Sequence, residues 1–356
     1  MRVNLFWWVT LVMLGLSGAG CGGFMARRMA QAPNTYPEWI APEARVLLAV
    51  DSRCLTNFPA RYVNVGPPPA RLRYRIVEPG DYGVEYSATN WLERGRAHFR
   101  FSFRTQVPGK STGFSGSPRG TVLLLHGYGM SQAVMAPWAL RLAQEGWRCV
   151  LVDLRGHGRS TGARIYFGVQ EVHDLSQLLD ELSRQGQLVE PVAALGESYG
   201  AALALRWPAA EPRVHTVVAL APYAELSHAM LNIRHEYARW VPQACVRAGL
   251  NRLPSLLQTQ PGEFDPATVL RRTPVLALFV AGDEDKVAPV AEVTRLCQQA
   301  APGSELLVVP RATHEALAYF FNDLVGPVLA WLKQADTSAR RPSSFRRDCT
   351  LAPGRE

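Results

Sequence analysis

The sequence predicts an α/β fold with a mostly parallel central sheet that is covered by helices on both faces. Short apolar runs alternate with longer amphipathic stretches through the middle of the chain, which is typical of strands connected by helices. Polar and glycine-rich turns follow several of the apolar runs, where a parallel sheet has its ligand-binding edge. The chain has 356 residues, of which 47% are hydrophobic and 19% charged, so it can bury one large core.

Two segments that precede the parallel core alternate strictly between polar and apolar residues, at 72–76 and 99–103. Such alternation is typical of strands with one solvent-exposed face, and we expect them to form the leading antiparallel strands of the sheet. The parallel strands are predicted at 121–126, 148–153, 191–196, 214–220, 275–281 and 305–310. The helices are predicted at 132–145, 169–185, 199–206, 288–300 and 315–333.

The turn after the strand at 191–196 has the sequence Gly-Glu-Ser-Tyr-Gly, with the serine at Ser198. A serine on a tight turn from a strand to a helix has its hydroxyl pushed out of the sheet, and the flanking glycines keep side chains from colliding. The alternative is a glycine-rich turn that happens to hold a serine. The rest of the chain favours the first interpretation.

A serine hydroxyl needs a histidine base and an acid that orients this base. Candidates for both follow Ser198 in the chain. The apolar run at 275–280 leads to Asp283, Glu284 and Asp285, and the run at 306–309 leads to His314. Because these turns follow parallel strands, we expect the side chains at the same edge of the sheet.

Two further motifs complete the pattern. The apolar run at 121–125 leads to His-Gly-Tyr-Gly at 126–129, where backbone amides can point at a developing oxyanion. The segment 153–162 reads Asp-Leu-Arg-Gly-His-Gly-Arg-Ser-Thr-Gly. With these motifs, which span 121–314, the chain resembles the α/β-hydrolases, and within them the serine aminopeptidase S33 and monoacylglycerol lipase-like group.

The resemblance implies a role for each matching residue. Ser198 matches the nucleophile and His314 the general base. The acid of the family usually stands three residues after the glycine that ends its strand, which is Asp285 here, with Asp283 as the fallback and Glu284 as a third choice. The oxyanion donors are expected to be the backbone N–H groups of Tyr128 and Tyr199, more than their side chains.

The implied activity is the cleavage of carboxylic esters through an acyl-enzyme, with a small acyl substrate that is plausibly derived from a lipid. An aminopeptidase of the S33 type and a non-catalytic binding protein of the cell envelope are the alternatives. Dehalogenases and epoxide hydrolases are disfavoured because they carry aspartate at the position of Ser198. No metal-binding motif and no cofactor motif is found in the sequence, and His126 and His157 are expected to hydrogen-bond neighbouring backbone and fix the shape of their loops.

The first 21 residues predict export. A short charged start precedes an apolar stretch at 5–16 and a run of small residues that ends at Cys21. This end is similar to the lipobox of bacterial lipoproteins, although Gly18 stands where that pattern prefers leucine. We expect a lipid at Cys21, with simple cleavage or a retained signal anchor as alternatives, and a membrane-anchored protein that faces the periplasm or the cell exterior.

The remaining segments complete the predicted organisation. Residues 22–69 are rich in proline and predict a tether or irregular extension, followed by the hydrolase domain at 70–334 and a basic, disordered tail at 335–356. The net charge of +8 gives weak attraction to polyanions, and no pattern argues for nucleic acid. A small helical cap is expected at 222–270, after the sixth strand. Its apolar stripe is expected to be the core of the cap more than a substrate wall: Met230, Ile233, Tyr237, Trp240 and Val241.

Overall fold

The computed structural model describes residues 20–35, 46–50, 52–93, 96–105 and 116–339, and most of the expected export signal and of the expected tail lies outside them. The central sheet has eight strands in the order β11-β10-β9-β8-β6-β7-β3-β2. The six strands from β6 to β11 pair in parallel, and β3 and β2 add antiparallel strands beside β7. Their bounds are Arg61–Val65 (β2), Ala70–Val77 (β3), Thr121–Leu125 (β6), Arg148–Asp153 (β7), Val192–Glu197 (β8), Val214–Leu220 (β9), Ala277–Gly282 (β10) and Glu305–Val309 (β11).

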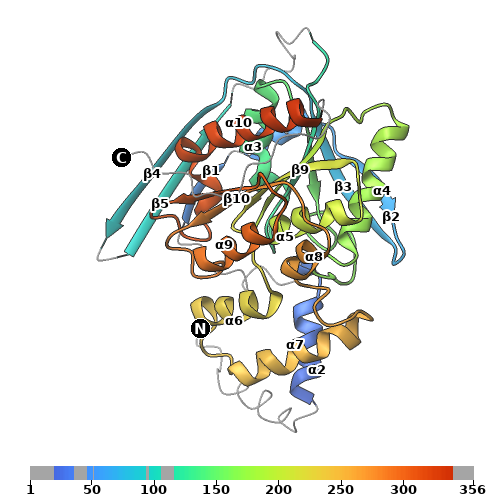
Figure 1. Ribbon diagram of the computed structural model, residues 1–356, viewed down its shortest axis with the longest axis vertical. Helices are drawn as coiled ribbons and strands as arrows, with labels where there is room; N and C mark the ends of the chain where they lie inside the picture. The colour runs from blue at the N-terminus through green and yellow to red at the C-terminus, as the bar shows by residue number, and fades with distance from the viewer. Residues whose placement is uncertain (1–19, 36–45, 51, 94–95, 106–115, 340–356) are drawn as a thin grey trace.

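Helices cover both faces of this sheet, as the alternating pattern predicts (Figure 1). The apolar side chains that face helices α4, α5, α8 and α9 form one buried cluster, and those that face α3 and α10 form the other. Strands β6 and β8 are buried along their whole length, which explains their continuous apolar sequences. The bounds are Ala136–Gln144 (α3), Glu171–Arg184 (α4), Tyr199–Arg206 (α5), Pro266–Arg272 (α8), Val290–Gln299 (α9) and Phe321–Ala339 (α10).

One of the two leading strands belongs to a different sheet from the one expected. Strand β5 (Arg96–Arg104) pairs with β1 (Val46–Val50) and β4 (Glu85–Glu93) in a separate three-stranded sheet. The alternation of β5 is real, but its apolar face packs on aromatic residues at the start of α10. Phe99 stacks on Phe320 with 4.7 Å between ring centroids, and Phe101 lies 5.1 Å from Phe321.

The segment expected to be a tether contains regular structure. Helix α2 (Gly20–Ala30) packs on helix α7 (Gln243–Leu257), and strand β2 already belongs to the central sheet, so the sheet begins before residue 70. The end of α2 is hydrogen-bonded to the body of the protein, because the amide of Ile165 donates to the carbonyl oxygen of Ala30 at 2.9 Å. This segment therefore connects the body to the inserted helices.

Helices α2, α6 (Leu226–Tyr237) and α7 form a lobe at one end of the molecule, below the sheet in Figure 1. Helices α6 and α7 fall within the insertion expected at 222–270, and α8 begins in it and ends two residues later, before β10. Among the described residues, no helix is long and apolar enough to cross a membrane. No disulfide joins the five cysteines that the structure describes, and Cys149 is a fully buried residue of β7, as its strand-like surroundings predict.

Candidate active site

Ser198 lies on the turn between β8 and α5 and has a backbone φ of +50°. A residue with a side chain rarely adopts this left-handed conformation, which costs about 1–3 kcal/mol and persists only where the surroundings impose it. Two glycines make the turn possible. A Cβ atom on Gly196 would lie 2.2 Å from the carbonyl oxygen of Gly200, and one on Gly200 would lie 2.1 Å from that of Leu125. The glycines of the Gly-Glu-Ser-Tyr-Gly motif are therefore required by close backbone packing.

The structure brings Ser198, His314 and Asp285 together from three different turns. The Oγ atom of Ser198 lies 2.8 Å from Nε2 of His314. On the other side of the imidazole ring, Nδ1 of His314 lies 2.8 Å from Oδ2 of Asp285. Nδ1 carries the proton when it donates to the carboxylate, and Nε2 is then free to accept the proton of the serine.

Asp285 is held by its own turn, while Asp283 lies elsewhere. Oδ1 of Asp285 accepts hydrogen bonds from the amides of Val287 and Ala288 at 2.8 and 2.7 Å, and the residue is buried. Asp283 is exposed, and its Oδ1 accepts a hydrogen bond from the amide of Arg311 at 2.5 Å. The geometry thus places Asp285 beside the ring of His314. Asp283 lies instead beside the backbone of Arg311, in the turn that leads to His314.

The electrostatic surroundings keep His314 basic. Burial acts to lower the pKa of His314, but the charge and hydrogen bond of Asp285 and the charge of Glu197 outweigh it, so this pKa is raised above its ordinary value. The neighbouring carboxyl group of Glu197 also has a raised pKa. Burial raises the pKa of Glu197 to about 7, although the charge of His314 acts to lower it.

Glu197 is a site residue that the sequence reasoning passed over. It is 2% exposed, it directly precedes Ser198, and its Oε2 atom is buried without a hydrogen-bond partner. A signal for it was present in the sequence, because an acid that ends an apolar strand beside the serine turn lies at the edge of the sheet where the candidate site is expected. Its proximity to the imidazole could only come from the folded chain.

The two residues expected to supply oxyanion donors lie next to each other. Tyr199 is the first residue of α5, where amides have no partner within the helix. The ring of Tyr128 lies 6.2 Å from that of Tyr199, so the turn after β6 closes on the start of α5. The amide of Tyr199 directly follows Ser198 in the chain, and the role of both backbone amides as donors stays a prediction.

His126 fixes the turn after β6 in the way expected. Its Nδ1 atom lies 2.8 Å from the carbonyl oxygen of Gly127, and the amide of Leu154 donates to its Nε2 at 3.1 Å. The ring therefore donates on one side and accepts on the other, which requires the neutral form. Nδ1 of His157 likewise lies 2.8 Å from the carbonyl oxygen of Arg155.

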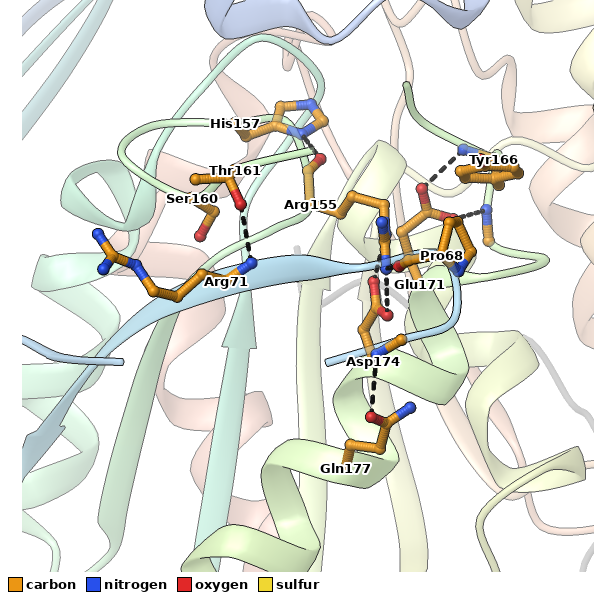
Figure 2. Close-up of polar contacts among 12 residues, drawn as sticks. Pro68, Arg71, Arg155, His157, Ser160, Thr161, Tyr166, Glu171, Asp174 and Gln177 are labelled. Carbon is orange, nitrogen blue, oxygen red and sulfur yellow. Dashed lines mark hydrogen bonds and ion pairs between the residues drawn. The ribbon is translucent and has the colours of Figure 1, made fainter. Parts of the chain in front are cut away.

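The loop that begins with Asp153 is held by a buried ion pair (Figure 2). The guanidinium group of Arg155 donates to both carboxylate oxygens of Asp174, at 2.6 and 2.7 Å, and also to the carbonyl oxygen of Pro68 at 2.8 Å. Asp153 itself accepts hydrogen bonds from the amides of Gln132 and Arg159. The charged residues Asp153 and Arg155 of this loop thus make internal contacts, and these contacts support the turn that carries Tyr128.

The apolar stripe of the inserted helices differs from the expected cap core. Met230 and Val241 pack against the core, but Ile233, Tyr237 and Trp240 are 36%, 43% and 82% exposed. Ile233 and Tyr237 lie one turn apart on α6 as the helical spacing predicts, whereas Trp240 lies in the turn after the helix. Within the part of the chain that the structure describes, these three side chains are left largely uncovered. The insertion does contact the site, because Nδ2 of Asn232 donates to the carbonyl oxygen of Val287 at 3.1 Å, in the turn of Asp285.

Comparison with known families and proteins agrees with this architecture. Residues 116–268 match the family model described as serine aminopeptidase, S33. An uncharacterized protein of Bacillus subtilis, YqkD, is 24% identical over 218 residues, which cover 57% of this chain and 67% of that protein.

Solved structures that are similar to this chain include an esterase and an α/β-hydrolase. The esterase Pf2001 of Pyrococcus furiosus has a TM-score of 0.57 and 18% identity, with 83% of this chain and 97% of that chain covered. The α/β-hydrolase GrgF of a Penicillium species has a TM-score of 0.54 and 16% identity, with 78% and 99% covered. The matched family model, together with these neighbours, supports a hydrolase as the class of protein. The structural likeness by itself, at these low identities, shows the fold alone. The chain therefore has the α/β-hydrolase fold.

Proposed function

We propose that the protein is a serine hydrolase that cleaves carboxylic esters through an acyl-enzyme. The observation that carries the proposal is the continuous chain of hydrogen bonds from Ser198 through His314 to Asp285, with both distances at 2.8 Å. The strained backbone of Ser198 supports it, because such strain is concentrated at functional sites.

The reaction follows from this geometry. Oγ of Ser198 attacks the acyl carbonyl carbon while its proton passes to Nε2 of His314. The backbone amides of Tyr128 and Tyr199 stabilise the oxyanion. His314 then returns the proton to the leaving alcohol, an acyl-serine forms, and a water molecule activated by the same histidine releases the acid.

Hydrolysis of p-nitrophenyl esters from acetate to palmitate tests the proposal, with Ser198→Ala as the inactive control. Loss of turnover and of fluorophosphonate labelling in this variant, with an unchanged circular dichroism spectrum, is the expected result. A folded wild-type chain that cleaves no ester and leaves Ser198 unlabelled would favour the non-catalytic binding protein instead.

An aminopeptidase of the S33 type is the second candidate, and the family model matched by residues 116–268 favours it. The same three side chains can cleave amides. Aminoacyl-anilides in the same assay separate the two activities, since an ester hydrolase turns over the p-nitrophenyl series and leaves the anilides intact.

We also propose that the protein is exported and held at a membrane by its N-terminal segment, with a lipid at Cys21. Support comes from the apolar run at 5–16 and from the position of Cys21 at the start of α2, where its side chain is only partly buried. Cys21 also contacts the thiol of Cys245 in α7, so the attachment point lies against the lobe. Mass spectrometry of the chain purified from a bacterial membrane tests this, because lipidation removes residues 1–20 and adds acyl chains to Cys21.

A further inference from the structure

The lobe formed by α2, α6 and α7 carries an exposed aromatic surface that the proposed chemistry does not use. Trp240 is 82% exposed, more than any other large hydrophobic side chain of the described residues. Tyr237 and Ile233 lie one helical turn apart on α6 and are also exposed. Phe24 on α2 is 55% exposed. Large apolar side chains exposed together on a small lobe mark an interaction surface.

The turn that presents Trp240 is built from specific hydrogen bonds. The guanidinium group of Arg234 donates to the carbonyl oxygens of Arg239 and Val241, at 2.8 and 2.7 Å, on either side of the tryptophan. The amide of Val241 donates to the carbonyl oxygen of Ala238 at 2.9 Å and closes the turn. Trp240 is thus held outward by a braced loop, which lowers the conformational entropy that docking would have to remove.

The charge of the lobe is strongly one-sided. Within residues 20–30 and 226–257 the only acid is Glu236. The same residues contain six arginines: Arg27, Arg28, Arg234, Arg239, Arg247 and Arg252. Arginines beside exposed tryptophan and tyrosine are typical of a surface that lies in the headgroup region of an anionic membrane.

The proposed attachment point argues for the same occupant. Cys21 is the second residue of α2 and is only partly buried, so a lipid on it would hold the start of α2 at the bilayer. Cys21 contacts Cys245, which lies five residues after Trp240. A chain held in a bilayer by a lipid at Cys21 therefore has Trp240 near the bilayer surface.

We propose that the lobe docks on an anionic lipid bilayer through Trp240, Tyr237 and Ile233, with its arginines against the headgroups. The inference rests on the proposed membrane attachment, and it adds that the lobe has a fixed orientation on the membrane surface. The inserted helices contact the turn of Asp285 through Asn232. Docking on this face therefore puts the inserted helices between the membrane and the candidate active site. A lipid-derived acyl substrate would reach the site from this side of the molecule.

The test uses the full chain reconstituted into phosphatidylcholine vesicles with phosphatidylglycerol, some of them with brominated acyl chains. The signal of Trp240 is the emission that is lost in Trp240→Phe. We expect this signal to shift to shorter wavelength and to be quenched by the brominated lipid, with less quenching when phosphatidylglycerol is omitted. Trp91→Phe is the matched control, because Trp91 is 36% exposed on β4, outside the lobe, and its signal should stay unquenched.

Three outcomes would overturn the proposal. If the protein floats with the vesicles but the signal of Trp240 is unchanged, the attachment holds the chain without docking of the lobe. If the protein does not float, both the attachment and the docking are wrong, while fluorophosphonate labelling of Ser198 still reports on the hydrolase separately. If the signal shifts without lipid and sedimentation equilibrium gives twice the chain mass, the surface binds a second copy of the chain.

Discussion

At the scale of single residues, the two aspartates of one turn offer a sharp test of the proposed mechanism. Asp285→Asn removes the charge that stabilises protonated His314 and allows the wrong tautomer, so we expect kcat to fall by roughly 10³–10⁴-fold. Asp283→Asn keeps an oxygen that can accept from the amide of Arg311, and we expect a change of no more than a few fold. Ester hydrolysis by the two purified variants is the measurement, and the reverse pattern would move the role of the acid to Asp283.

Glu197 predicts a second effect, on the pH dependence of the reaction. Its charge raises the pKa of His314, so Glu197→Gln should lower that pKa. The base is active when it is unprotonated, and the acidic limb of kcat/KM against pH should therefore move to lower pH in the variant.

Profiles between pH 5 and 9 measure this shift, with Glu284→Gln as the control because Glu284 is an exposed acid of the neighbouring turn. An acidic limb that stays in place in Glu197→Gln would mean that Glu197 is protonated over the whole range in which His314 titrates.

At the scale of elements, the contact between α2 and α7 depends on a small residue. A Cβ atom on Gly22 would lie 2.9 Å from the carbonyl oxygen of Ala248, while one on Gly23 would meet nothing closer than 3.7 Å. We expect Gly22→Ala to push the helices apart at a cost of about 1–3 kcal/mol. Gly23→Ala should be neutral or stabilising by up to about 1 kcal/mol, because alanine has the higher helix propensity.

Hydrogen exchange of the amides in α2 measures both effects. Faster exchange in Gly22→Ala and unchanged or slower exchange in Gly23→Ala is the expected result. Equal exchange in the two variants would show that close packing at this crossing does not hold the helix.

At the scale of the whole molecule, two buried histidines predict sensitivity to acid. Burial lowers the pKa of His126 to about 4 and that of His157 to about 3, with the charge of His126 adding to the second effect. The unfolded chain binds these protons near the ordinary pKa of about 6.5. Stability is therefore fully present above pH 6.5 and is lost as the pH falls toward 4, by up to about 1.4 kcal/mol per pH unit for each histidine.

Urea unfolding between pH 7 and 5 measures this loss. His157→Asn retains a donor for the carbonyl oxygen of Arg155 and should flatten the slope, whereas His173→Asn, at an exposed position, should leave it unchanged. A free energy of unfolding that stays constant down to pH 5 would contradict the prediction.

The sequence by itself determined the six parallel strands of the central sheet, because inner strands that are buried on both faces appear as continuous apolar runs such as that of β6. It also determined the turn of Ser198, since only glycine fits at Gly196 and Gly200. It indicated the strand turns that carry Asp285 and His314, because the ends of parallel strands meet at one edge.

The tertiary structure alone decided the features that depend on long-range partners. The family resemblance favours Asp285 and leaves Asp283 as the fallback, and only the fold sets the first against His314 and the second against the amide of Arg311. The alternation of β5 predicts a strand, but the aromatic side chains around Phe320 determine which sheet it joins. The helical spacing of Trp240 and Tyr237 predicts an apolar face, and whether a face is covered depends on neighbours that a local pattern does not contain.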